Sequence, residues 1–168
     1  MTNINISAFN PAQASQVRQL ILGIQRDEFG IDIDLARQPD LSDIPGFYQV
    51  GRGNFWVALA GERVVGTVSL LDIGHGQGAL RKMFVDKDYR GSAAGVAQLL
   101  LEALMTHARS QGIHEIILGT TAKFLAAHRF YEKNGFTEIA KEALPAAFPV
   151  MAVDVKFYHL YLPASPIM

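Results

Sequence analysis

The sequence predicts an α/β (α+β) domain with a central mixed, mostly antiparallel sheet of about seven strands and helices on both faces. Apolar and polar residues alternate over several short segments, which is typical of half-buried strands. Longer segments carry apolar residues at helical spacing. Glycine, proline or asparagine separates most of these segments. The resulting order is strand, helical region, three strands, helix, strand, helix and two strands.

The first third of the chain contains one strand and one helical region. "NINISAF" at 3–9 alternates as a short strand does, and the following Asn-Pro pair is typical of a helix start. Apolar residues at helical spacing carry that helix to about Phe29. Residues 30–53 are rich in Asp, Pro and Gly, which predicts a partly ordered surface segment with a short helix near 32–38.

The middle of the chain predicts a hairpin and a third strand. "NFWVALA" at 54–60 and "RVVGTVSLLDI" at 63–73 flank a Gly-Glu turn, as antiparallel partners do. "GHGQG" at 74–78 is a glycine-rich connector, and "ALRKMFV" at 79–85 follows it as a strand. A long helix is expected over 92–111, ending before Gly112.

The last third predicts alternating short elements. The expected elements are a buried strand at 113–119, a helix at 121–134, a short strand at 136–140 and a long final strand at 150–162.

Length and composition indicate one domain over residues 1–168. With 49% hydrophobic and 18% charged residues, 168 residues suffice for one sizeable core and are too few for two comfortable ones. The absence of cysteine excludes disulfides, thiolate metal sites and a cysteine nucleophile, and it fits a reducing compartment. The N-terminus lacks the features of a signal peptide, and no apolar run approaches a membrane span. We therefore expect a cytoplasmic protein without a membrane partner.

The net charge of the chain is too small to create a strong electrostatic field around the whole protein. The net charge of −1 does not favour nucleic acid, and the five histidines show no metal-ligand spacing, so we expect neither a nucleic-acid partner nor a metal. Residues 1–80 nevertheless carry −3 and residues 81–168 carry +2. This asymmetry is either chance or a sign of an anionic ligand in the second half and a cationic one near the first.

The start of the long helix consists mostly of residues with small side chains. "DYRGSAAGVAQLLLEAL" at 88–104 places small residues where several backbone N–H groups face outward, and such a helix end can bind an anion. The helix dipole contributes only about 0.3–1 kcal/mol, whereas micromolar affinity needs roughly 8 kcal/mol. An anion held here must use several amides at once, as a pyrophosphate would. Alternatively, the small residues only allow the helix to pack tightly on the sheet.

Two motifs in this half resemble those of the GNAT superfamily of N-acetyltransferases. The first follows a strand and opens the long helix, and its residues are Arg90, Ala93 and Gly95. The second lies on the next helix, and its residues are Ala127, Phe130, Tyr131, Gly135 and Phe136. The resemblance covers residues 54–140, and the element order extends it over the whole chain. It implies transfer of an acetyl group from acetyl-CoA to a primary amine by direct attack on the thioester.

The resemblance also implies a set of cofactor contacts. The pantetheine arm would pair with the backbone of Met83, Phe84 and Val85 like an added strand, and the Phe84 amide would stabilise the oxyanion. The pyrophosphate would bind at the helix start and the second motif would complete the site. These residues are Arg90, Gly91, Ser92, Ala93, Ala94, Gly95, Val96, Phe124 and Ala127.

Acetyl transfer requires a proton acceptor and a proton donor. An amine of pKa about 10.4 is neutral in about one molecule in a thousand at pH 7, so a base is needed. The leaving thiolate needs a proton, and the resemblance assigns this role to Tyr131, whose alternative is a core aromatic. The strand Glu of many family members is replaced here by Arg81 and Lys82. The base therefore stays open among Asp72, His75 and Glu28, and His75 can equally be an exposed loop residue.

The acceptor side is expected within residues 10–53. Six acidic residues are concentrated there, and they either cap turns and helices or form an acidic mouth for a cationic amine. They are Asp27, Glu28, Asp32, Asp34, Asp40 and Asp43. Alternatively, Arg81 and Lys82 receive an acidic group on a small-molecule or peptide amine.

Two other functions and the oligomeric state stay open at this point. A non-catalytic acyl-CoA-binding or regulatory module would keep the fold without turnover. An unrelated nucleotide binder is disfavoured because neither glycine-rich segment is followed by the Gly-Lys-Ser/Thr of a phosphate loop. A homodimer through the long final strand is one alternative for assembly.

Overall fold

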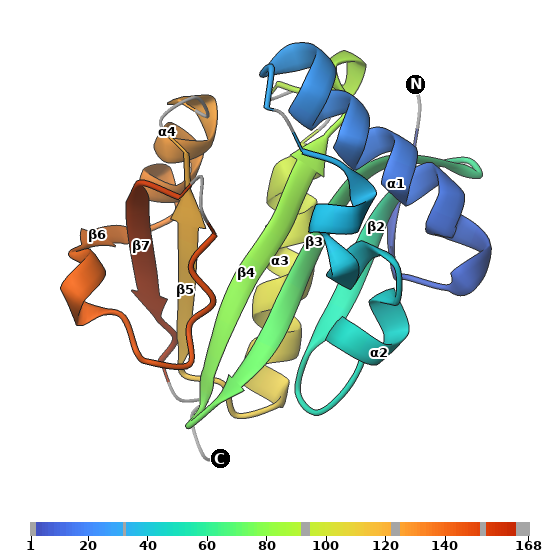
Figure 1. Cartoon of the computed structure of the whole chain (residues 1–168). Helices are drawn as coiled ribbons and strands as arrows, with labels where there is room; N and C mark the ends of the chain where they lie inside the picture. The colour runs from blue at the N-terminus through green and yellow to red at the C-terminus, as the bar shows by residue number, and fades with distance from the viewer. Residues whose placement is uncertain (1–2, 32, 92–94, 122–124, 152–153, 164–168) are drawn as a thin grey trace.

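The predicted strands form one seven-stranded sheet in the order β1-β2-β3-β4-β5-β7-β6 (Figure 1). The structure is a computed structural model, and it describes residues 3–31, 33–91, 95–121, 125–151 and 154–163. The strands are β1 Ile4–Ala8, β2 Asn54–Ala60, β3 Arg63–Gly74, β4 Gln77–Val85, β5 Glu115–Thr120, β6 Thr137–Ile139 and β7 Lys156–Tyr161. The α-helices are α1 Ala14–Gly23, α2 Ile44–Tyr48, α3 Val96–Ser110 and α4 Leu125–Lys133. The predicted fold class is confirmed.

The sheet contains a single parallel pair, β4 with β5, and its other pairs are antiparallel. A parallel pair needs a long crossover, and α3 supplies it. The pairing of β4 with β5 is short, running from Gln77↔Glu115 to Ala79↔Ile117. By contrast, β4 pairs with β3 along almost its whole length, from Gln77 to Val85.

Apolar clusters cover both faces of the sheet. Alternate residues of β2 belong to opposite cores, since Trp56 packs with the α3 side and Phe55 with the α1 and α2 side. On α3 the helical spacing buries Leu100 and Leu104 completely. Figure 1 shows α3 behind the sheet and α1 and α2 in front of it. Each such buried side chain stabilises the fold by about 1.5–3 kcal/mol.

Several element boundaries differ from the prediction. The first helical region divides into a 3-10 turn at Pro11–Gln13, the helix α1 and a π-helical turn at Ile24–Glu28. β4 begins at Gln77, inside the predicted connector, because Gly74 and Gly76 adopt positive φ and make the hairpin turn tight.

The long helix and the final strand both begin later than expected. α3 begins at Val96 because Gly95 is left-handed, with φ of 61°, while Ser92, Ala93 and Ala94 lie outside the described residues. β7 begins at Lys156, and just before it the Asp154 N–H donates to the Met151 carbonyl at 3.0 Å.

The final strand is an inner strand, because β7 lies between β5 and β6. The short β6 covers β7 only from Phe157 to His159, and the oligomeric state stays a prediction. None of the helices in the described ranges combines the length and the apolar character needed to cross a bilayer.

Candidate active site

A β-bulge deforms β4 next to the point where it leaves β5. Thr67 pairs with Phe84 and Ser69 with Arg81, so Lys82 and Met83 together oppose the one remaining β3 residue. Lys82 has a φ of 56°, which is uncommon for a residue with a side chain.

Two buried hydroxyls on β3 support this conformation. Thr67 Oγ1 donates to the Lys82 carbonyl at 2.7 Å, and Ser69 Oγ donates to the Arg81 carbonyl at 2.8 Å. The bulge removes these carbonyls from the regular ladder, and an unpaired buried carbonyl is costly. The side chains of Thr67 and Ser69 therefore stabilise the bulge.

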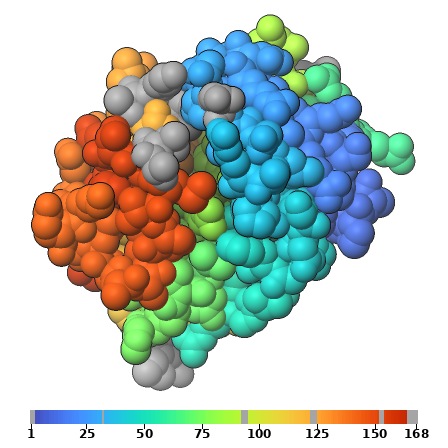
Figure 2. All heavy atoms as spheres, in the orientation of Figure 1, coloured from blue at the N-terminus to red at the C-terminus, as the bar shows by residue number. Residues whose placement is uncertain are grey.

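A cavity of about 120 Å³ lies where β4 and β5 diverge. Figure 2 shows the surface hollowed between the blue-cyan and the orange-red residues, with green atoms of β4 inside the hollow. The cavity walls come from β4, β5, α4, the segment after α1 and the segment before β7. Seven of the residues that line the cavity matter for the chemistry discussed below: Arg81, Lys82, Met83, Phe84, Ala127, Tyr131 and Asp154.

Tyr131 lies in the cavity wall and is only 4% exposed. Phe130, Phe136 and Tyr158 contact its ring, with centroid distances of 5.6, 5.5 and 6.3 Å. Burial raises the pKa of Tyr131 well above its ordinary value. The phenol is therefore protonated at neutral pH and can donate a proton or hydrogen bond into the cavity.

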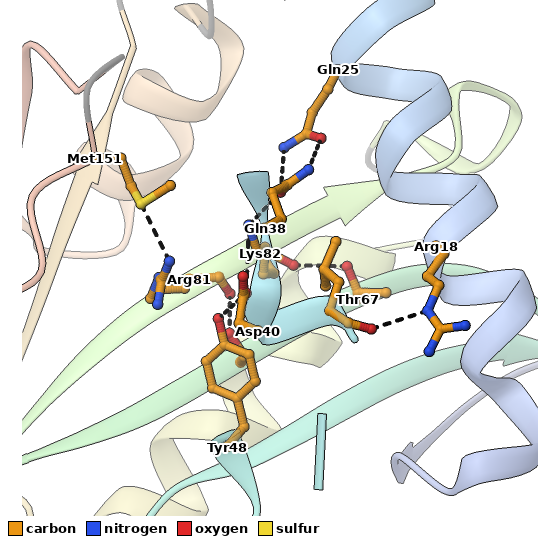
Figure 3. Close-up of polar contacts among 11 residues, drawn as sticks. Arg18, Gln25, Gln38, Asp40, Tyr48, Thr67, Arg81, Lys82 and Met151 are labelled. Atoms are coloured by element: carbon orange, nitrogen blue, oxygen red, sulfur yellow. Dashed lines mark hydrogen bonds and ion pairs between the residues drawn. The ribbon is translucent and has the colours of Figure 1, made fainter. Parts of the chain in front are cut away.

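A buried polar network closes the side of the cavity next to α1 and α2 (Figure 3). Gln25 and Gln38 exchange two amide hydrogen bonds at 2.9 and 3.1 Å. Lys82 Nζ donates to Gln38 Oε1 at 2.6 Å and lies 3.6 Å from Asp40 Oδ2. The Tyr48 hydroxyl donates to the same Asp40 oxygen at 2.6 Å. Each charge in this network therefore has a partner.

Lys82 is almost enclosed, with 7% of its side chain exposed. Burial lowers the pKa of Lys82 to about 8, although the negative charge of Asp40 opposes this shift. The charge of Lys82 is thus held within the wall of the cavity.

Arg81 presents a different environment. Its guanidinium lies over the rings of Phe47 and Tyr48, at 5.6 and 5.9 Å from the ring centroids. An NH2 group of Arg81 donates to Met151 Sδ at 3.3 Å, a weak acceptor (Figure 3). No carboxylate of the described chain forms an ion pair with it.

Asp154 lies in the cavity wall beside β5. A Cβ at Gly119 would meet Asp154 Oδ2 at 2.6 Å, so the carboxylate packs directly over the bare backbone of that glycine. Oδ2 accepts the Met151 N–H at 3.0 Å. Burial raises the pKa of Asp154, while the Met151 N–H and the charges of Arg81 and Lys82 act in the opposite direction.

The loop before α3 connects to the rest of the site through Arg90. Its Nε donates to the Val85 carbonyl at 2.8 Å, and its two terminal nitrogens donate to both Glu28 oxygens at 2.7 and 2.8 Å. Gly91 and Gly95 both have positive φ, and among the residues that the structure describes no side chain caps the start of α3. The first N–H groups of α3, beginning at Val96, are therefore not used by a side-chain cap.

Comparison with known proteins identifies the family. Residues 19–136 match the model of the Acetyltransferase (GNAT) family. The chain belongs to this family. An N-acetylaspartate synthetase of Xenopus tropicalis is 37% identical over 109 residues, which are 64% of this chain and 40% of that protein. Human N-acetyltransferase 8 is 31% identical over 143 residues, covering 80% of this chain and 61% of that protein.

These two curated relatives are longer than this GNAT chain, which spans 40% and 61% of their lengths. A solved GNAT-family acetyltransferase of Staphylococcus aureus Mu50 superposes with a TM-score of 0.92 at 40% identity, over 96% of this chain and all of the other. A PaiA N-acetyltransferase of Thermoplasma acidophilum, solved with coenzyme A, shares the fold, with a TM-score of 0.70 at 15% identity over 95% and 99% of the two chains.

The three residues considered as the base of this GNAT site do not line the cavity. Asp72 accepts the N–H groups of Arg52 and Gly74 at 3.0 and 2.9 Å. His75 lies at the tip of the β3–β4 hairpin, with φ of 56°. Glu28 is taken up by Arg90. Turn geometry explains the position of Asp72, because its short carboxylate side chain accepts backbone N–H groups at the hairpin end.

The acidic segment after α1 mostly stabilises local structure. Asp34 and Asp43 accept backbone N–H groups at the starts of short helices, at 3.0 and 3.1 Å. Asp40 is the exception, since it pairs with Lys82 inside the protein. Asp32, like Phe124, lies outside the described residues. The acidic-mouth interpretation therefore has little support from the described residues.

Neither Asp154 nor the amide pair of Gln25 and Gln38 is among the site residues predicted from the sequence. Both features depend on residues that are distant in sequence, and no spacing links them. In the sequence, Asp154 falls inside the predicted final strand at 150–162, where nothing distinguishes it from an ordinary strand residue.

Proposed function

We propose that this chain is an acetyl-CoA-dependent N-acetyltransferase that moves the acetyl group to a primary amine by direct attack on the thioester. The observation that carries the proposal is the cavity between the diverging strands β4 and β5, with the buried phenol of Tyr131 in its wall. The N-acetyltransferase names of the relatives support the same reaction class.

Acetyl-CoA would enter along β4 as a co-substrate. Met83, Phe84 and Val85 are the proposed contacts of the pantetheine arm, and the Phe84 amide is the proposed oxyanion donor. The pyrophosphate would bind the amides from Gly91 to Val96, where the positive end of α3 favours an anion. Ala127 of α4 lies in the same cavity wall.

In the proposed reaction, one cavity residue donates a proton and another accepts one. The amine nitrogen attacks the thioester carbon, a C–N bond forms and the C–S bond breaks. Tyr131 gives its proton to the leaving sulfur. Asp154 takes a proton from the acceptor ammonium and passes it to water, and the second N–H proton lost by the nitrogen restores Tyr131. Asp154 replaces Asp72, His75 and Glu28 in this role because it alone among them lines the cavity.

Thermal unfolding with acetyl-CoA, coenzyme A and ATP tests the cofactor assignment. At a ligand concentration of about 100 Kd, binding to the native state adds about 2.7 kcal/mol, which is roughly 5–10 °C in Tm for a domain of this size. We expect this increase with both coenzyme A species and none with ATP. No increase with either coenzyme A species would contradict the proposal.

A cytoplasmic location stays a separate proposal.

A further inference from the structure

We infer that the acceptor amine carries a carboxylate, as a free amino acid does, and that Arg81 binds this carboxylate while Asp154 faces the amino group. The inference deepens the proposed function and rests on it for the reaction. The binding part can be measured without turnover.

Arg81 is the cation of the cavity that is available to a ligand. Its guanidinium offers five N–H donors, and within the described chain the only hydrogen bond from it goes to Met151 Sδ. The rings of Phe47 and Tyr48 contact the face of the guanidinium. Its N–H groups, which lie at the edge of the plane, are not occupied by these rings. A planar fork of donors matches a carboxylate in a bidentate geometry.

Lys82 is not available to bind the carboxylate of a ligand, because its charge already has a partner. Its Nζ already donates to Gln38 and lies beside Asp40, whose carboxylate balances it. The pair of Lys82 and Asp40 is therefore neutral as a unit, and Arg81 supplies the unbalanced positive charge on the β4 side.

Asp154 supplies the opposite charge on the β5 side. Gly119 leaves the room in which this carboxylate sits. Oδ2 accepts the Met151 N–H, whereas no donor of the described residues bonds to Oδ1. A cation on one strand and an anion beside the other, across one cavity, complement an ammonium and a carboxylate on the same small molecule.

The most direct experiment compares each of the common L-amino acids with its own carboxamide as the acceptor. Thiol release from acetyl-CoA gives kcat/KM for both members of a pair. We expect at least one amino acid to exceed its carboxamide by roughly 100-fold, the value of a charge-assisted bidentate contact. Equal rates for every pair, or reaction only with amines that lack a carboxylate, would overturn the inference and leave the proposed function standing.

Variants locate the effect at Arg81. Arg81→Met should remove the preference for the amino acid, whereas Arg109→Met, on the exposed last turn of α3, should keep it. Arg81→Lys keeps the charge and the stem but loses the fork, so we expect about a tenfold loss. Retained stabilisation by coenzyme A shows that each variant is folded. A preference that survives Arg81→Met in a folded variant would contradict the assignment.

Calorimetry separates this inference from the proposed reaction. The same amino acids are titrated into protein saturated with coenzyme A, and Arg81→Met should lower the affinity of the preferred one by roughly 100-fold. Such binding without any thiol release would overturn the proposed function and support the inference. Thiol release with simple amines, without binding of any amino acid, would do the reverse.

Discussion

Tyr131 illustrates how burial fits one residue to a chemical role. The aromatic rings around it exclude water and keep the phenol protonated, yet the residue lines the cavity. Tyr131→Phe removes the hydroxyl and preserves the ring packing. We expect turnover to fall by about 10²–10⁴-fold while acetyl-CoA still raises Tm, because a general acid contributes about that much. Unchanged turnover would exclude Tyr131 from the mechanism.

The proposed role of Asp154 as the base predicts how activity depends on pH. Asp154→Asn keeps an oxygen acceptor for the Met151 N–H but cannot take a proton. We expect kcat/KM to fall by about 10²–10⁴-fold. In the unchanged protein, activity should be lost as pH falls through the raised pKa of Asp154, because the carboxylate then becomes protonated. Asp88→Asn, on the exposed segment before α3, is the matched control. An acidic limb that persists in Asp154→Asn would contradict the role.

At the residue scale, local motifs predicted part of the site and tertiary contacts decided the rest. Tyr131, Met83 and Ala127 were implied by the resemblance to the GNAT motifs, and all three line the cavity. Asp154 was not predictable, because its place depends on Gly119 of another strand. The same holds for Glu28, whose carboxylate meets Arg90 only after folding.

At the element scale, the bulge in β4 is the feature with the largest consequence. It aims Lys82 inward, where burial lowers its pKa to about 8. The hydroxyls of Thr67 and Ser69 that support it were visible in the sequence only as polar residues in an apolar strand. Periodicity predicted where most elements lie, whereas their boundaries depended on features such as the left-handed Gly95.

The buried amine of Lys82 makes stability depend on pH. Between pH 8 and 10.5 the unfolded chain holds a proton on this lysine that the native protein has lost, so the free energy of unfolding should rise with pH there. Relative to Lys82→Met, we expect the unchanged protein to gain on the order of 1–2 kcal/mol from pH 8 to 9.5. Urea unfolding at several pH values measures this difference. A difference that stays constant with pH would show that Lys82 does not titrate in this range.

At the scale of the whole molecule, the topology creates the site. One parallel pair joins the β1–β4 part of the sheet to β5, β7 and β6, and the short pairing of that pair leaves room between the two strands. The α3 crossover that the parallel pair requires also places a helix start beside the same strand. The sequence order predicted this arrangement as a class, but the extent of the opening depends on the register of β4 and β5.

The proposed activity is amine-dependent acetyl transfer within this opening. Thiol release from acetyl-CoA, measured with a panel of primary amines that includes amino acids, tests it most directly. We predict release that requires an amine and matches the N-acetyl product in amount. Stabilisation by acetyl-CoA without thiol release for any amine would contradict the claim and indicate a module that only binds the cofactor.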